Sequence, residues 1–227
     1  MSGRGHWAEA QLDYTFKDTT LLDLALTHRS ASKANNERLE YLGDSFLNFA
    51  IARRLFERRP HDTEGDLSRA RAALVKEPTL AAIGQRLGVD AHLTLGPGEL
   101  RSGGAQRAAL LADAVEALIG AVLLDGGAAA AEAVVDLMFA DQFASLPDAA
   151  TLKDPKTRLQ EWLQGRGLPL PSYAVTAVHG RDHAQTFVVE CEVREKNAVT
   201  TGQGQSRRRA EQEAAAAMLV VLTGERH

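Results

Sequence analysis

Three carboxylates recur at helical spacing within residues 35–47. Glu37, Glu40 and Asp44 stand at positions i, i+3 and i+7, which places them on one narrow face of a helix. No cation shares this face, because Arg38 points about 100° away by helical geometry. Two like charges about 4 Å apart repel by about 4 kcal/mol at the effective dielectric of a protein surface, so the row favours a bound cation. A solvated helix face is the alternative interpretation.

A second pair of carboxylates lies in an apolar stretch, residues 108–124. Asp113 and Glu116 are three residues apart, so they share a helix face, and no Lys or Arg stands four residues from either. A helix that is apolar on nearly every side is normally buried, and a buried carboxylate is costly unless it is paired or bound to a metal. This pattern favours a functional pair over two carboxylates at a solvated edge.

Glu64 has two interpretations that the local sequence leaves open. Thr63 and Asp66 resemble a capping box, and acids in the first turn of a helix suit its dipole, so Glu64 has a complete structural explanation. A functional role is equally compatible with the sequence.

Carboxylates without His or Cys among them predict a hard cation such as Mg²⁺ or Mn²⁺ rather than zinc. The six candidates are Glu37, Glu40, Asp44, Glu64, Asp113 and Glu116. Mg²⁺ is commonly held by a few carboxylates together with phosphate oxygens of the substrate, which makes metal-assisted phosphodiester hydrolysis the leading chemistry. His28 has no second His or Cys at ligand spacing, so we expect it to be structural.

The elements that must position these carboxylates are helices in an ordinary globular chain. The first acidic helix stops before Pro60, because proline cannot extend a helix. The chain has 227 residues, of which 44% are apolar and 25% charged, so it suffices for one large or two small domains and excludes disorder. A lone Cys191, no signal-peptide pattern and no membrane-length apolar run predict a cytoplasmic protein.

Charge is divided unevenly along the chain. The net charge is −4, yet residues 1–150 hold 15 Lys and Arg against 21 Asp and Glu, whereas residues 151–227 hold 11 against 9. Residues 145–154 lose periodicity and resemble a linker. Beyond it we expect a helix over 157–164, strands over 173–178, 186–193 and 198–201, and a final helix, with Cys191 in the core.

The final helix begins with an unusual run of cations. Ser206 is a good N-cap, but Arg207, Arg208 and Arg209 follow in the first turn, where the helix dipole makes each cation unfavourable by about 0.3–1 kcal/mol. Phosphate groups would reverse that cost, so the run favours an RNA or DNA partner over a solvated basic cluster.

The acidic segments together resemble the ribonuclease III family. The matching motifs, in family order, are Asn36–Asp44, Glu64–Ser68, Leu95–Glu99, Ser102–Gly104 and Leu111–Ala117. The resemblance implies that Glu40, Asp44, Asp113 and Glu116 hold the metal, with Asp44 and Glu116 also catalytic. It implies that Glu37 and Glu64 are catalytic residues as well, which line the cutting site and help to place RNA. Tyr41 stands where the family usually has phenylalanine at its dimer interface, and Ala109 where serine is common.

The C-terminal segment resembles a double-stranded RNA-binding domain, through its predicted element order and a Gly-x-Gly-x-Ser-Arg-Arg-x-Ala pattern at 202–210. Such domains span about 16 base pairs of A-form RNA. The resemblance implies minor-groove contacts from Thr157, Gln160 and Glu161, a further groove contact from His183, and phosphate contacts from Ser206, Arg207, Arg208 and Arg209. Glu211 stands where many such domains carry lysine, which predicts weaker binding.

We therefore expect an all-α ribonuclease III domain (1–147), a linker (148–153) and an α-β-β-β-α double-stranded RNA-binding domain (154–224). The implied activity is Mg²⁺-dependent cleavage of double-stranded RNA by a homodimer, with Mn²⁺ as a substitute ion. Its products carry 5′-phosphate and 3′-hydroxyl ends with two-nucleotide 3′ overhangs, and ribosomal and messenger RNA precursors are the expected substrates. No nucleotide cofactor or membrane partner is expected. The alternatives are a protein that binds double-stranded RNA without cutting it and a hydrolase of small phosphates.

Overall fold

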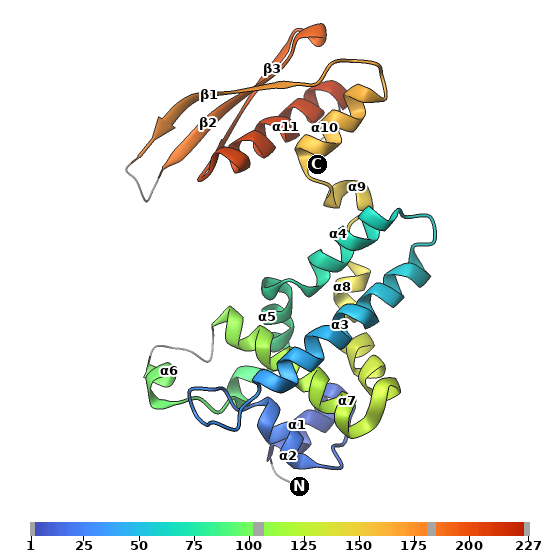
Figure 1. The fold of residues 1–227 in the computed structure, drawn as a ribbon, viewed down its shortest axis with the longest axis vertical. Coiled ribbons are helices and arrows are strands. Elements are labelled where there is room, and N and C mark those ends of the chain that lie inside the picture. Colours follow the sequence, from blue (N-terminus) through green and yellow to red (C-terminus); the bar gives the residue numbers. More distant parts are fainter. Residues whose placement is uncertain (1–2, 102–106, 181–184, 225–227) are drawn as a thin grey trace. The chain divides into compact units, whose positions relative to one another are not determined.

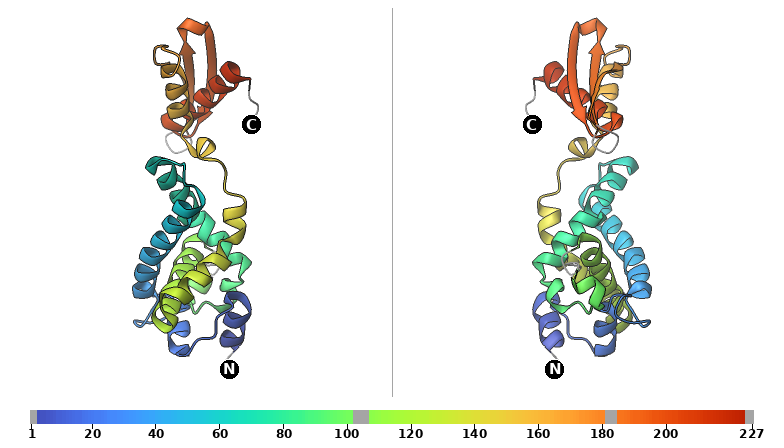
Figure 2. Two further views of the ribbon diagram at one scale, coloured as in Figure 1. Left: turned by 90° about the vertical axis from the view of Figure 1, so that its right-hand side faces the viewer. Right: turned by 90° about the vertical axis from the view of Figure 1, so that its left-hand side faces the viewer.

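The computed structural model describes residues 3–101, 107–180 and 185–224, drawn in Figure 1 and Figure 2. The chain divides into two compact units, Met1–Ala149 and Ala150–His227. The division falls inside the segment expected as a linker, where a short helix, α9 (Ala149–Leu152), stands in place of irregular chain. The domain boundaries 1–147 and 154–224 stay predictions.

Among its described residues, the first unit is built of helices joined by loops, with one isolated β-bridge between Thr27 and Thr94. Its elements are α1 (Gly3–Leu12), α2 (Thr19–Ala25), α3 (Glu37–Arg58), α4 (Glu64–Val75), α5 (Glu77–Arg86), the 3-10 helix η1 (Val89–His92), α6 (Pro97–Arg101), α7 (Ala108–Met138) and α8 (Ala140–Ala144). The fully buried positions of α7 lie on nearly every side of its first half, which makes α7 the central helix, with α3 and α5 packed against it. This confirms the buried apolar helix that the sequence predicts.

The backbones of α3 and α7 touch where the two helices pack (Figure 1). A Cβ atom on Gly43 would lie 1.8 Å from the carbonyl oxygen of Glu116. A Cβ atom on Gly120 would lie 2.2 Å from the carbonyl oxygen of Leu39. Since these separations are far inside van der Waals contact, only glycine fits at either position, and the pair fixes how closely the two helices approach.

Two local features set the ends and course of the helices. The capping box at the start of α4 is present: the Thr63 side chain accepts from the backbone N–H of Asp66, and the Asp66 side chain accepts from that of Thr63. Helix α7 continues to Met138, beyond the predicted end at Leu124, across a single non-helical residue, Gly127 (φ 80°). Glycine adopts this left-handed φ without a Cβ penalty, so the alanine-rich turns after it can resume the helix.

The second unit has one sheet covered on one face by helices. Its elements are α10 (Pro155–Gln164), β1 (Ser172–His179), β2 (Thr186–Val193), the 3-10 helix η3 (Arg194–Lys196), β3 (Ala198–Gly204) and α11 (Arg207–Thr223). The strands form an antiparallel sheet in the order β1-β2-β3, with Cys191 opposite Tyr173 on one side and Thr200 on the other. The predicted helix and strands are confirmed, each within a few residues.

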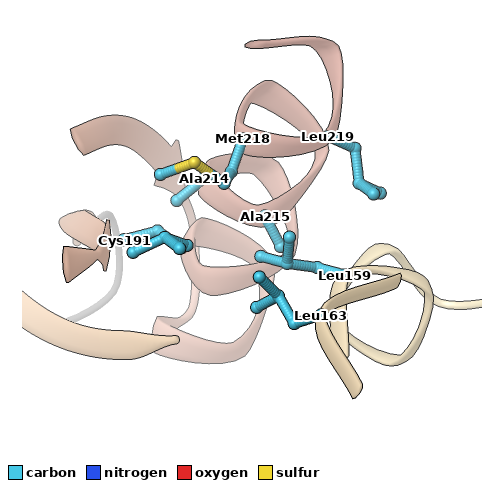
Figure 3. Packing of buried hydrophobic residues seen from close by; sticks show 8 residues of the cluster. Leu159, Leu163, Cys191, Ala214, Ala215, Met218 and Leu219 are labelled. Atoms are coloured by element: carbon cyan, nitrogen blue, oxygen red, sulfur yellow. The ribbon is translucent and has the colours of Figure 1, made fainter. Parts of the chain in front are cut away.

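Side chains from α10, β2 and α11 meet in the core of this unit. Figure 3 shows Leu159 and Leu163 of α10 facing Ala214, Ala215, Met218 and Leu219 of α11, with Cys191 of β2 at the edge of the cluster. Cys191 is fully buried, which confirms its expected place in the core. Glu190 and Glu192 alternate with the buried positions of β2 and therefore point to the other face of the sheet.

Candidate nuclease site and RNA interface

The contact between α3 and α7 places four carboxylates around one point of the fold. Glu40 and Asp44 lie on α3 on either side of Gly43, whose Cα faces the backbone of Glu116. Asp113 precedes Glu116 by three residues on α7, on the same helix face. Carboxylates about 70 residues apart in the chain are thus neighbours because two glycines let the helices touch.

These side chains act on one another's charges, and the shifts of their pKa values follow from that proximity. Burial, followed by repulsion from Asp44, Glu40 and Asp113, raises the pKa of Glu116 to about 8. Burial, followed by repulsion from Asp113, Glu37 and Asp44, raises the pKa of Glu40. Burial also raises the pKa of Asp113. Each raised pKa means that the protein environment disfavours the ionised carboxylate. A bound cation would stabilise the ionised form.

The donor set fits a hard divalent ion. All four groups are carboxylates, the oxygen ligands that such ions prefer. Among the described residues, no three His, Cys, Asp or Glu side chains are drawn together closely enough to hold a metal ion by themselves. An open arrangement of this kind suits Mg²⁺, which keeps several waters and usually completes its shell with substrate phosphates instead of an all-protein cage.

Two residues that the sequence did not assign to the site lie beside the carboxylates. His28 and Arg29 line a cavity of about 400 Å³ together with Asn36, Glu37, Glu40, Ala109, Leu110 and Asp113. Arg29 Nη1 is 3.5 Å from Glu37 Oε1, and its charge lowers the pKa values of Glu40 and Asp113 against the larger effect of burial. His28 was expected to be structural. Its imidazole also lowers the pKa of Asp113, against the larger effect of burial.

Long-range backbone contacts bring this loop to the site. The N–H of His28 donates to the carbonyl of Thr94 at 3.0 Å, and the N–H of Asn36 donates to the carbonyl of Thr27 at 2.9 Å. Thr27 and Thr94 also form an isolated parallel bridge. The sequence offers no periodic signal for such contacts, so only the dipeptide His28-Arg29 just before the acidic helix could have suggested the neighbourhood.

Glu37 and Glu64 occupy different surroundings. Glu37 belongs to the cavity that Glu40 and Asp113 line, and its Oε2 atom accepts from Asn35 Nδ2 at 3.2 Å. Glu64 lies instead in a cavity of about 630 Å³ with Phe49 and Phe56, and its Oε1 atom accepts from Ser68 Oγ at 2.8 Å. Within a single chain, the described residues therefore do not bring Glu64 into the cavity that Glu40 and Asp113 line.

The candidate RNA contacts of the second unit lie on two helices. Thr157, Gln160 and Glu161 are exposed on α10, opposite the buried face of that helix, and Glu161 forms an ion pair with Lys153 at 2.9 Å. The Ser206 side chain caps α11 by accepting from the N–H of Arg209 at 3.3 Å, as predicted. Arg207, Arg208 and Arg209 are all exposed. His183 lies outside the described residues.

Comparisons with known proteins agree with the division of the chain into two units. The Ribonuclease-III-like family profile matches residues 18–142, and the double-stranded RNA binding motif matches residues 155–222. Ribonuclease 3 of Pseudomonas fluorescens strain SBW25 is 54% identical over 94% of this chain and 93% of its own length. Ribonuclease 3 of Vibrio vulnificus strain YJ016 is 52% identical over 94% of this chain and 95% of its own length. The nuclease domain of ribonuclease III from Campylobacter jejuni is 40% identical with a TM-score of 0.59, covering 61% of this chain and 97% of that domain.

A helical nuclease domain with a carboxylate site, followed by a double-stranded RNA-binding domain, defines an endoribonuclease that acts on double-stranded RNA. The chain belongs to the ribonuclease III family. The family uses divalent metal ions, in agreement with the donor set at the contact of α3 and α7. None of the described helices combines the length and apolar character needed to span a membrane.

Proposed function

We propose that Glu40, Asp44, Asp113 and Glu116 hold Mg²⁺, for which Mn²⁺ can substitute. The observation that carries this proposal is the close packing of α3 on α7 at Gly43, which brings the carboxylates of the two helices together, and the raised pKa of Glu116 supports it. When bound, the ion lowers the pKa of water and offsets the charge that develops on phosphorus-bound oxygen. Arg29, beside Glu37, is placed to orient an RNA phosphate at the mouth of the same cavity.

The proposed reaction is hydrolysis of a phosphodiester bond. The oxygen of a water molecule forms a bond to phosphorus while the bond from phosphorus to the 3′ oxygen breaks. The 3′ oxygen gains a proton and leaves as a hydroxyl, and the phosphate stays on the 5′ end of the other product. Asp44 and Glu116 are proposed as the carboxylates most essential for cleavage, with Glu37 and Glu64 helping to place the RNA.

We propose a homodimer formed through α3. Tyr41, Phe49 and Phe56 are 78%, 58% and 72% exposed, and at i, i+8 and i+15 they lie within about 80° of one another around the helix. An exposed row of large apolar side chains marks a protein interface. The related nuclease domain from Campylobacter jejuni has a structurally flexible region that is involved in dimer formation.

A symmetric dimer would explain two further features. It would contain two carboxylate sites, so that both strands of a duplex are cut, with two-nucleotide 3′ overhangs as the proposed outcome. Glu64 lies in the same cavity as Phe49 and Phe56 on the proposed interface. This shared cavity supports a role for Glu64 across the proposed interface, although within its own chain Glu64 lines a different cavity from Glu40.

For the second unit we propose contacts to A-form RNA at three places. Thr157, Gln160 and Glu161 would contact one minor groove, His183 the next, and the segment 206–209 the phosphates between them. The exposure of α10 and of the arginine run supports this assignment. Ribosomal and messenger RNA precursors in the cytoplasm are the proposed substrates.

A metal titration with a long RNA duplex tests the nuclease site. We expect no cleavage without a divalent ion and cleavage with Mg²⁺ or Mn²⁺, giving ends that carry 5′-phosphate. Asp113→Asn should raise the Mg²⁺ concentration required for half-maximal cleavage, since it removes one anionic ligand. The control is Asp90→Asn, a carboxylate of η1 that is not among the residues lining the cavity of Glu40 and Asp113. An equal Mg²⁺ requirement for Asp113→Asn and Asp90→Asn would contradict the ligand assignment, and RNA that stays intact but filter-bound with Mg²⁺ would favour a non-cleaving binder.

A further inference from the structure

Glu211 is a nearly buried acid at the start of α11, with 9% of its surface exposed. Its two carboxylate oxygens contact two different cations. Lys156 Nζ is 2.5 Å from Oε2, and Arg207 Nε is 2.9 Å from Oε1. Lys156 belongs to α10 and Arg207 to α11, so one carboxylate joins the first turns of two helices that are far apart in the chain.

Lys156 is held from a second side as well. Its Nζ atom lies 4.5 Å from the centroid of the Tyr173 ring, within cation–π distance. A free lysine side chain populates many rotamers, and these two contacts remove much of that freedom before any ligand arrives. Lys156 nevertheless keeps 34% of its side-chain surface exposed, and Arg207 keeps 65%.

Both cations lie next to the proposed RNA contacts. Lys156 precedes Thr157 and lines a cavity of about 220 Å³ with Gln160, whereas Arg207 begins the arginine run. The contact with Glu211 uses Nε of Arg207, so the two terminal amino groups of the guanidinium are outside that contact. A phosphate can therefore bind to the pair without displacing Glu211.

We propose that Glu211 is a positioning residue that holds Lys156 and Arg207 as one preorganised pair for RNA phosphates, and that Lys156 is itself a phosphate contact. This inference rests on the proposed RNA face of the second unit. It reverses the expectation that the acid at position 211 weakens binding. If Glu211 only repelled phosphates, its removal would tighten RNA binding. If Glu211 positions Lys156 and Arg207, its removal weakens RNA binding.

The size of the effect follows from ordering two side chains. Each long side chain that must be immobilised on binding raises Kd by about twofold to twelvefold. Removal of Glu211 transfers that cost to the binding step for two residues, while the gain of one net positive charge offsets part of it. We expect Glu211→Ala to raise the Kd for duplex RNA about fivefold to tenfold.

The test uses the full chain and a duplex of about 20 base pairs without divalent metal, so that the RNA stays intact. Kd is measured by filter binding over a series of salt concentrations for Glu211→Ala, Glu211→Gln and Lys156→Gln. The matched control is Glu190→Gln, which removes the same charge from the sheet face opposite the buried side chains. We expect the Glu211 variants to bind more weakly, Lys156→Gln to lower the salt slope by about one, and Glu190→Gln to bind slightly more tightly.

Three outcomes would overturn the inference. The first is tighter binding by both Glu211 variants. The second is weaker binding that matches only the unfolded fraction seen in thermal melting, with an unchanged salt slope. The third is an unchanged Kd and salt slope for Lys156→Gln, measured on protein that thermal melting shows to be folded. Arg208→Gln distinguishes failure of the positioning role from failure of the proposed RNA face. If Arg208→Gln weakens binding while the Glu211 variants do not, only the positioning role is wrong. If Arg208→Gln has no effect on binding, the RNA face itself is wrong.

Discussion

Replacing Glu116 by Gln should make the metal-free protein more stable at alkaline pH. Burial and three neighbouring carboxylates raise the pKa of Glu116 from 4.5 to about 8. The folded state therefore favours the protonated form of Glu116. The stability that this preference contributes is complete below pH 4.5 and is lost as the pH rises through 8. For a fully shielded carboxylate, the free energy of unfolding would fall by about 5 kcal/mol over this pH range. Because Glu116 is partly accessible to solvent, we expect a decrease of about 2 kcal/mol.

Thermal unfolding without metal, between about pH 4.5 and about pH 9, measures this difference. A Trp162→Phe background leaves Trp7 of α1 as the sole tryptophan, so its fluorescence reports the nuclease unit. We expect Glu116→Gln to melt about 4–8 °C higher than the parent at about pH 9 and to converge with it near pH 4.5. The control is Glu9→Gln, an exposed acid whose neutralisation should change little at either pH. Equal melting of Glu116→Gln and parent at the alkaline end would refute the charge crowding inferred at this site.

The same variant connects stability with function. Mg²⁺ at about pH 8 should raise the melting temperature of the parent, because a ligand that binds the folded state stabilises it, and should raise that of Glu116→Gln far less. Cleavage should stop while RNA binding stays within about twofold, since α10 and α11 are untouched. Unchanged turnover would remove the assignment of Glu116 to the site.

Three further perturbations test other parts of the structure. Phe56→Asp should produce a lighter species in sedimentation velocity and slower cleavage, because Phe56 is exposed on the proposed dimer face and folding tolerates a charge there. Gly43→Ala should destabilise the nuclease unit by about 3 kcal/mol or more in chemical denaturation, since its Cβ would lie 1.8 Å from the Glu116 carbonyl oxygen. Arg207→Ala with Arg208→Ala should weaken duplex binding and lower its salt slope by about two, and an unchanged slope would argue against phosphate contacts there.

The sequence predicted those parts of the fold that depend on local spacing. Glu40 and Asp44 share a helix face because covalent spacing and helical geometry determine it, and the same holds for Asp113 and Glu116. The capping box at Thr63 was recognisable for the same reason. That the two acidic pairs face each other was implied by the family resemblance, and the physical cause lies in the close packing of α3 and α7 at Gly43 and Gly120.

Other features depend on contacts that spacing cannot reveal. His28 and Arg29 reach the acidic site through a bridge between Thr27 and Thr94, which are distant in the chain. Glu211 was interpreted from its position alone, whereas its partner Lys156 lies 55 residues earlier. The role that we propose for Glu211 in RNA binding depends on that partner, which position in the sequence alone does not reveal.

The backbone contact at Gly43 and Gly120 fixes the distance between the carboxylates of α3 and those of α7. The gap between the acidic side chains of α3 and α7 is set by peptide groups in contact and not by the volume of any intervening side chain. Drift in the surrounding leucines and valines can therefore change how well the nuclease unit tolerates heat while leaving the spacing across the reaction centre constant. Sequences could diverge widely in this interior and still cut RNA at the same rate, provided that these two positions never acquire a side chain.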